Sequence, residues 1–226
     1  MAQEPKLFIY DLDGVITDTA EFHYLAWKKL ADEIGIPIDR KFNEQLKGIS
    51  RMDSLDRILD LAPSATALSS EEKIRLASRK NAHYLELIEA INPDYILPGI
   101  NLLLQQNKEA GIRTALGSAS KNAPRILEKL GLGDYFDYVV DAGQVEKGKP
   151  DPETFTVAAD ALQVAYEDCV GIEDAAAGVE AINRANMFSV GVGDTAHLAH
   201  ADYLVNETSE LDFQQIIERF HEWKKE

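Results

Sequence analysis

The sequence predicts an α/β fold, a doubly wound parallel sheet of the Rossmann-like kind with an inserted α-helical segment. The first observation behind this prediction is a set of short, continuous apolar runs, which are typical of strands covered on both faces. The second is that helical patterns lie between most of these runs, which indicates a parallel sheet with helices on both faces. The third is one long stretch in which this alternation stops. The apolar runs are Leu7–Tyr10, Ile112–Leu116, Tyr138–Val140, Cys169–Ile172, Phe188–Val192 and Tyr203–Val205.

Local signals support the helices between these runs. The pattern from Ile100 to Ala110 stops at Gly111, and glycine is common after a helix because it tolerates a left-handed backbone. A second helix follows Asn122 and has a proline in its first turn, and a third starts at Asp151–Pro152, where a capping residue precedes a proline. The last helix carries its apolar side chains on one face: Phe213, Ile216, Ile217, Phe220 and Trp223.

Residues 17–92 break the alternation and contain mostly helical patterns. Asp18–Glu21 predicts a capping box that opens the first of these helices. Gly48 and Pro63 predict breaks between the later ones. We therefore expect two domains, an α/β core of residues 1–16 and 93–226 and a helical cap domain of residues 17–92. The later helices are expected at Arg40–Leu46, Asp53–Leu61 and Ser70–Ala90.

Composition limits the partners of the protein. The 226 residues include 23 lysines and arginines against 39 acidic residues, a formal net charge of −16, and no run of basic residues, so we expect no binding to nucleic acid. No apolar stretch approaches the roughly 20 residues of a membrane span, and the first residues lack the pattern of a signal peptide. We therefore expect a cytoplasmic monomer without a membrane partner. Cys169 is the single cysteine, which excludes an internal disulfide, and its apolar surroundings favour a buried thiol over a nucleophile.

Two carboxylates follow the first apolar run, in Asp11-Leu12-Asp13-Gly14. Alternate residues at a strand end can face one site, and two carboxylates so close together repel each other unless a cation lies between them. Mg2+ suits oxygen ligands and phosphate. One carboxylate could then attack phosphorus while the other moves a proton. An acidic turn after a strand, without catalytic function, is the alternative reading.

Small hydroxyl residues follow the second run, in the stretch from Gly117 to Asn122. Hydroxyls, backbone N–H groups and a helix N-terminus together favour an anion, so this stretch predicts a phosphate site. The alternative is that Ser120 or Asn122 only caps the following helix.

Two further strand ends carry charged residues. Lys149 stands just before a capped helix, where it could hold a phosphate or an aspartate, although a solvated turn lysine is an equal alternative. Glu173 and Asp174 end the fourth run, where they could bind a cation or interact only with the following helix dipole. Because the carboxyl ends of parallel strands meet at one edge of a sheet, we expect these groups to lie near Asp11.

Taken together, these four motifs resemble those of the haloacid dehalogenase superfamily of phosphotransferases, along the whole chain. The resemblance implies that Asp11 is the nucleophile and Asp13 the general acid and base. It also implies a Mg2+ cofactor held by Asp11, by the backbone carbonyl of Asp13 and by Asp174, with Glu173 in or beside this set. One departure is that Ala175-Ala176 stand where the family commonly has Ser-Gln, which leaves the surroundings of the metal loop open.

The helical segment contains further candidates. Thr19, His23 and Trp27 are spaced by four residues and share one helix face. The stretch from Lys47 to Ser54 places basic and hydroxyl residues at a helix start, and Lys80-Asn81 adds a polar pair. Taken singly, each has an ordinary structural reading, such as a surface histidine or a core tryptophan.

As a set, these residues resemble the sugar phosphomutases of the same superfamily. That resemblance implies an isomerase that interconverts β-D-glucose 1-phosphate and glucose 6-phosphate through an aspartyl-phosphate and a β-glucose 1,6-bisphosphate intermediate. The alternatives are a sugar-phosphate or phosphoglycolate phosphatase with the same nucleophile and a non-catalytic sugar-phosphate binding module. The residues expected to bind substrate are Thr19, His23, Trp27, Lys47, Gly48, Arg51, Ser54, Lys80, Asn81, Ser118, Ala119, Ser120, Lys121, Asn122 and Lys149.

Overall fold

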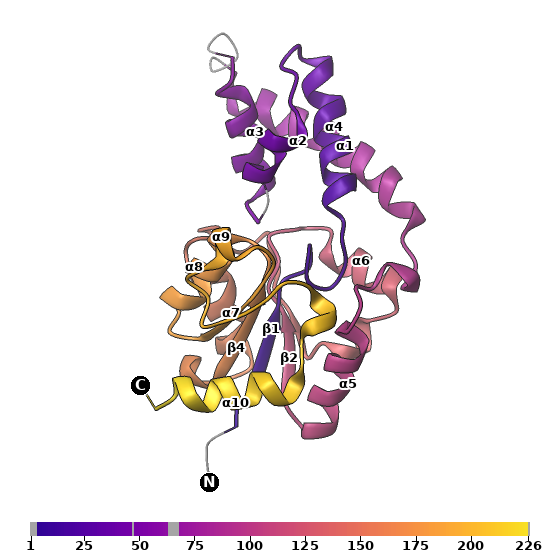
Figure 1. The fold of residues 1–226 in the computed structure, drawn as a ribbon. Coiled ribbons are helices and arrows are strands. Elements are labelled where there is room, and N and C mark those ends of the chain that lie inside the picture. Colours follow the sequence, from indigo (N-terminus) through magenta and orange to yellow (C-terminus); the bar gives the residue numbers. More distant parts are fainter. Residues whose placement is uncertain (1–3, 47, 63–67, 226) are drawn as a thin grey trace. The chain divides into compact units, whose positions relative to one another are not determined.

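A computed structural model describes residues 4–46, 48–62 and 68–225 (Figure 1). The chain forms two compact units. The first contains the chain up to Asp18 and from Asn92 onward, and the second spans Thr19–Ile91.

The first unit is built on a six-stranded, fully parallel sheet with the order β3-β2-β1-β4-β5-β6. This arrangement confirms the predicted doubly wound fold, since the chain starts in the middle of the sheet and adds strands first on one side and then on the other. The strands in the described part of the chain are β1 (Leu7–Tyr10), β2 (Arg113–Leu116), β3 (Tyr138–Val139), β4 (Cys169–Glu173), β5 (Phe188–Val192) and β6 (Tyr203–Val205).

Helices cover both faces of this sheet because successive side chains of its strands, which point to opposite faces, are largely apolar. On one face, Ile9 packs in a buried cluster with Phe155 and Ile182 of two covering helices. On the other face, Phe8 stacks on Phe213 at 6.2 Å between ring centroids, and Figure 1 shows the helix of Phe213 in front of the sheet. The helices are α5 (Ile100–Ala110), α6 (Ala123–Leu130), α7 (Glu153–Ala161), α8 (Ala176–Arg184), α9 (Thr195–Leu198) and α10 (Phe213–Trp223), with 3-10 turns η4 (Pro93–Tyr95), η5 (Gly133–Tyr135), η6 (Tyr166–Asp168) and η7 (Thr208–Glu210).

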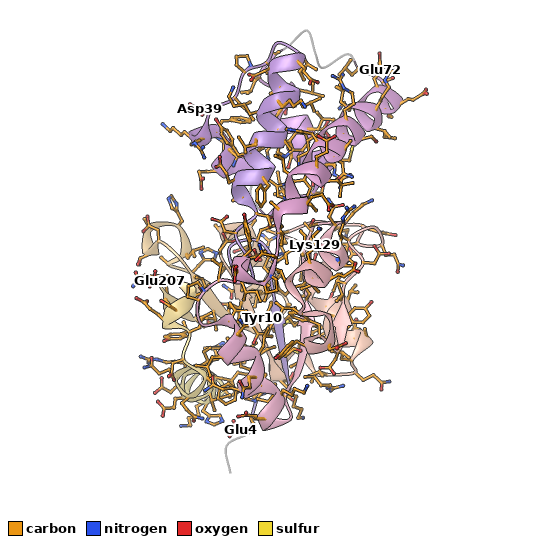
Figure 2. All side chains as sticks on the ribbon, turned by 90° about the vertical axis from the view of Figure 1, so that its right-hand side faces the viewer. Glu4, Tyr10, Asp39, Glu72, Lys129 and Glu207 are labelled. Atoms are coloured by element: carbon orange, nitrogen blue, oxygen red, sulfur yellow. The ribbon has the colours of Figure 1, made fainter. Side chains whose placement is uncertain are left out.

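The second unit is helical. Its core contains Trp27, Leu55 and Ile58, all buried. The predicted capping box at Asp18–Glu21 is wrong: the first helix begins at Ala20, and the side chain of its N-cap residue makes no capping bond. A complete capping box lies instead at Ser69. Its side chain accepts from the amide of Glu72, and the Glu72 side chain accepts from the amide of Ser69 (Figure 2 labels Glu72). The elements are α1 (Ala20–Glu33), α2 (Arg40–Asn43), η1 (Glu44–Leu46), α3 (Arg51–Leu59), α4 (Ser70–Leu87) and η3 (Ile88–Ala90).

Two further observations concern the apolar character of the helices and the state of the single cysteine. Among the described residues, every helix is too short or too polar to span a membrane. Cys169 is a buried free thiol, as predicted. Burial and the neighbouring Asp168 raise its pKa to about 12, so the reactive thiolate is scarce at neutral pH.

An ion cluster around the buried Asp168 joins residues near both ends of the first unit. Asp168, whose side chain is 4% exposed, accepts from the ammonium groups of Lys6 at 2.8 Å and Lys224 at 3.1 Å. Burial by itself would raise the pKa of Asp168, but the bonds from the two lysines outweigh it and lower that pKa. Asp168 therefore stabilises the fold as an anion and links the strand entry at Lys6 to the end of α10.

Replacing Asp168 with Asn should lower the free energy of unfolding by about 1–2 kcal/mol at pH 7, because the charge leaves but both lysines remain partly in water. Folding lowers the Asp168 pKa, so its contribution is present above the ordinary aspartate pKa of about 3.9 and is lost as the pH falls through the folded value. Urea unfolding at pH 7 and in acid measures both effects. Asp134→Asn, at an exposed position of η5, is the control, and equal losses in the two variants would contradict the prediction.

Candidate active site

Strand register brings the predicted residues of the first unit to one edge of the sheet. Tyr10, the last residue of β1, lies opposite Leu116 of β2 on one side and Ile172 of β4 on the other (Figure 2 labels Tyr10). The next residues on these strands, Asp11, Gly117 and Glu173, therefore lie next to one another. This is the convergence of strand ends that the sequence predicted.

Lys149 is the centre of this edge. Its buried ammonium donates to Asp11 Oδ1 at 2.6 Å, to Glu173 Oε2 at 2.7 Å and to the backbone carbonyl of Gly117 at 3.1 Å. The aromatic ring of Phe155, in the first turn of α7, lies 5.1 Å from the same ammonium. Lys149 is thus a fixed charge within the sheet edge and not a solvated turn lysine.

The charges of this cluster depend on one another. Burial alone would lower the pKa of Lys149, but the carboxylates of Asp11 and Glu173 outweigh burial and raise it. Burial raises the pKa of Glu173 to about 7, and the charge of Asp11 adds to this rise while Lys149 opposes it. Lys149 therefore stays an ammonium ion at neutral pH, and its charge is what allows two buried carboxylates to lie so close together.

Three carboxylates form a candidate metal centre. Ligand oxygens of Asp11, Glu173 and Asp174 all lie within 4.8 Å of one another. Carboxylate oxygens are the ligands that hard divalent cations prefer, so this donor set fits such an ion. Both oxygens of Glu173 already accept hydrogen bonds, one from Lys149 and one from the amide of Ala175 at 3.1 Å. Asp11 also accepts two bonds, from Lys149 at Oδ1 and from the amide of Asp13 at Oδ2. Hydrogen bonding therefore does not rank these two residues, and the three carboxylates together form the candidate ligand set.

Asp13 is not part of that carboxylate group in the described residues. It lies in the loop after β1, is partly exposed, and its amide donates to Asp11 Oδ2 at 3.0 Å. That bond orients the second oxygen of Asp11, while Lys149 holds the first.

The predicted phosphate loop forms a series of short turns. The Ser118 hydroxyl is buried and accepts from the amide of Ser120 at 3.1 Å, and the Ser120 hydroxyl accepts from the amide of Asn122 at 3.3 Å. Asn122 is the N-cap residue of α6, but its side chain makes no capping bond. Ala119 is partly buried, and Lys121 is exposed. The loop places Ser118 directly beside Gly117, whose carbonyl binds Lys149.

Small residues follow Glu173 and Asp174 at the start of α8, among them Ala175 and Gly178. Ala175 is the N-cap of α8, and its side chain makes no capping bond. Its backbone amide donates to Glu173 Oε1 at 3.1 Å. A Cβ on Gly178 would overlap this carboxylate, and a Cβ on Gly14 would overlap that of Asp174. The two acidic side chains are therefore packed directly against backbone, a feature that residue spacing alone does not reveal.

Within the second unit, the predicted residues of α1 meet Lys80. The Lys80 ammonium is buried and lies 2.8 Å from His23 Nδ1 and 4.7 Å from the ring centroid of Trp27. It is equally close to the ring of Tyr84, whose hydroxyl donates to Thr19 Oγ1 at 3.3 Å. Tyr84 is not among the residues predicted from the sequence, although its position four residues after Lys80 on one helix places the two side chains on the same face.

This Lys80 cluster keeps His23 neutral. Burial, and then the charges of Lys80 and Arg51, lower the pKa of His23 well below its ordinary value. Because an ammonium can only donate, His23 Nδ1 must accept from Lys80, which leaves the imidazole proton on Nε2.

The remaining predicted residues of this unit lie near the start of α3 or beside Lys80. Arg51 is the first residue of α3 and is partly buried, and Ser54 is buried with its hydroxyl donating to the carbonyl of Ser50 at 2.9 Å. Gly48 has a left-handed backbone, and Asn81 follows Lys80 on α4. Lys47 lies outside the described residues.

Comparison with known proteins gives consistent relatives. Residues 5–186 match the family model described as haloacid dehalogenase-like hydrolase. The chain is 48% identical over 219 residues to a β-phosphoglucomutase of Bacillus subtilis (strain 168), which covers 97% of both chains. It is 31% identical over 189 residues to a fructose-1-phosphate phosphatase of Escherichia coli (strain K12), covering 81% of this chain and 94% of the relative.

The solved structures agree. A crystal structure of a β-phosphoglucomutase from Clostridium difficile has a TM-score of 0.96 and 51% identity to this chain, and the match covers 98% of this chain and 100% of the other.

Replacing Gly178 with Ala should disturb the charged cluster. The new methyl group would push the Glu173 carboxylate away from Lys149, and we expect a loss of about 2–3 kcal/mol in the free energy of unfolding. Gly133→Ala is the matched control, because a Cβ there meets nothing within 4 Å. Urea unfolding of both variants measures the difference, and equal stabilities would show that Glu173 can move without loss.

Proposed function

This chain belongs to the haloacid dehalogenase-like hydrolase family, and from that premise we propose that it is a β-phosphoglucomutase. It interconverts β-D-glucose 1-phosphate and glucose 6-phosphate through an aspartyl-phosphate and a β-glucose 1,6-bisphosphate intermediate. The observation that carries the proposal is the 48% identity to the Bacillus subtilis β-phosphoglucomutase over 97% of both chains. The phosphatase alternative has weaker support, since the Escherichia coli sugar phosphatase is 31% identical over a smaller share of this chain.

Asp11 serves as the nucleophile in this proposal. It attacks the phosphorus of the bisphosphate, the bond between phosphorus and a sugar oxygen breaks, and Asp13 gives its proton to that oxygen. In the other half-reaction Asp13 takes a proton from a hydroxyl of an incoming β-glucose 1-phosphate, and that oxygen takes the phosphoryl group from Asp11. The bisphosphate formed in this way turns before it reacts with Asp11 again. The Lys149 ammonium, which donates to Asp11, and the buried Ser118 hydroxyl, in the loop after β2, would bind oxygens of the transferring group.

Mg2+ is the proposed cofactor. Asp11, Asp174 and the backbone carbonyl of Asp13 would hold it, with Glu173 in support, and when bound it would offset the negative charge of the phosphoryl oxygens. The oxygen-only donor set supports this choice.

The helical segment 17–92 is proposed as the cap that selects the sugar phosphate. Arg51, together with Ser120, Lys121 and Asn122, would bind the phosphate that is not transferred, since arginine suits bidentate phosphate contacts. The sugar contacts are assigned to Thr19, His23, Trp27, Lys47, Gly48, Ser54, Lys80, Asn81 and Ala119. A cytoplasmic monomer that acts on small sugar phosphates is part of the same proposal and rests on the sequence.

One assay separates the candidate functions. Purified protein is given β-glucose 1-phosphate, Mg2+ and a trace of β-glucose 1,6-bisphosphate, and the formation of glucose 6-phosphate and the release of phosphate are followed in parallel. The mutase predicts that glucose 6-phosphate dominates, that chelation of Mg2+ stops the reaction, and that Asp11→Asn lowers the rate by at least about 1,000-fold. Asp134→Asn, on the surface, should leave the rate unchanged. Dominant phosphate release would favour the phosphatase, and full turnover in Asp11→Asn would exclude both mechanisms.

His23 is proposed, together with Thr19, to keep Asp13 from activating water before a sugar arrives. His23→Asn should then raise the ratio of phosphoenzyme hydrolysis to phosphoryl transfer, by roughly tenfold for a barrier change of about 1.4 kcal/mol. The ratio is measured by mixing phosphorylated protein with and without glucose 6-phosphate. His197→Asn, an exposed histidine of α9, is the control. An unchanged ratio in His23→Asn would rule out this role.

A further inference from the structure

Thr17 is a buried polar residue next to the loop that carries Asp13. It has no exposed surface, although it lies one residue before the end of the first chain segment of its unit. Its amide donates to the carbonyl of Leu12 at 3.1 Å, and its carbonyl accepts from the amide of Gly14 at 2.8 Å. These two bonds close the loop around Asp13, with which Thr17 also forms a β-bridge.

Burial and a further backbone bond restrict the rest of the loop from Leu12 to Thr17. The amide of Ile16 donates to the carbonyl of Leu12 at 2.9 Å, and the side chains of Leu12, Val15 and Ile16 are fully buried. Gly14 lies so close to Asp174 that a Cβ would overlap its carboxylate. The position of the loop therefore depends on what holds its far end, where Thr17 lies.

The Thr17 hydroxyl ties that far end to a distant part of the sequence. It donates to the backbone carbonyl of Tyr95 at 2.8 Å, and Thr17 pairs with Ile96 in an antiparallel bridge. The amide of Leu97 donates to the carbonyl of Ile16 at 3.0 Å beside it. The segment that leaves this unit and the segment that returns to it are thus joined, and one of the bonds comes from a side chain.

We propose that Thr17 is a positioning residue for Asp13. Its hydroxyl fastens the loop Leu12–Thr17 to the segment Pro93–Leu97 and so sets where the Asp13 carboxyl lies relative to Asp11. This inference rests on the proposed function, because it takes Asp13 as the group that moves a proton to and from the sugar. Proton transfer requires hydrogen-bond geometry, and a displacement of 1 Å can lower a rate about 100-fold. Loosening the loop should therefore affect the steps that use the proton of Asp13 and spare those that do not.

Two phosphoryl donors distinguish these steps. When β-glucose 1,6-bisphosphate phosphorylates Asp11, the leaving sugar oxygen must take a proton from Asp13. When acetyl phosphate is the donor, Asp11 attacks phosphorus and the bond from phosphorus to the acetyl oxygen breaks. Acetate then leaves with the electron pair as a stable anion, so no proton is needed. A residue that only stabilises the fold would change both rates alike.

Three substitutions separate the hydroxyl from packing. Thr17→Val keeps the shape and removes the hydroxyl, whereas Thr17→Ser keeps the hydroxyl and removes a methyl group. Rapid-quench measurement of Asp11 phosphorylation should show kcat with the bisphosphate lowered about tenfold or more in Thr17→Val, with KM within about twofold. Its rate with acetyl phosphate should stay within about twofold of wild type, and Thr17→Ser should resemble wild type with both donors. If Thr17→Val does not fold, Thr17→Ser and Thr17→Ala differ only by the hydroxyl and allow the same comparison.

The possible outcomes are distinct. Equal losses with both donors, no loss with either, or a Thr17→Ser variant as slow as Thr17→Val would overturn the positioning role and leave the proposed mutase intact. A wild-type protein that neither donor phosphorylates would overturn the proposed function itself, and this inference with it.

Discussion

The Lys149 ammonium is the interaction on which the rest of the site depends. The parallel register of β1 and β4 forces Asp11 and Glu173 into neighbouring, buried positions, where two like charges would repel strongly. Lys149 lies between them with a third bond to the carbonyl of Gly117. A buried charge is tolerated only with such partners, since removing one of them leaves the others uncompensated. The loop before α7 must therefore deliver this lysine, and the sheet edge is assembled around it.

The backbone of two glycines lies against carboxylate side chains of the site and restricts where those side chains can be. Gly14 packs on Asp174 and Gly178 on Glu173 without room for a side chain. A Cβ on Gly117 would come within 3.0 Å of Ile9, so the carbonyl that binds Lys149 is also held against the core. Carboxylates wedged against backbone lose little conformational freedom when they bind a cation or a phosphoryl group, because most of that freedom is already absent.

The fold could be predicted from the sequence because its signals are local: apolar runs, helix ends and glycines. The meeting of Asp11, Lys149 and Glu173 could be predicted in outline, because parallel strand ends share one edge. Their pairing could not, since it depends on register and on the path of the loop before α7. The capping-box prediction was wrong because the exact start of a helix also depends on the fold. Asp18–Glu21 and Ser69–Glu72 both fit the sequence pattern, but Asp18 lies one residue before the N-cap of α1, whereas Ser69 is the N-cap of α4. The contact of Tyr84 with Lys80 likewise depends on the packing of α1 against α4.

The charge of the acidic cluster is a physical reason for the proposed divalent cation. Three carboxylates and one ammonium leave a formal charge of −2 at the sheet edge, or −1 when Glu173, whose pKa is about 7, carries a proton. The whole chain adds to this field, with a net charge of −16. A phosphate dianion would be repelled from such a site, and Lys149 is already engaged by two carboxylates. A divalent cation held by these carboxylates would offset the local charge, and a phosphoryl group could then approach Asp11. The same carboxylates that are proposed to carry the reaction would therefore also create the requirement for a cation.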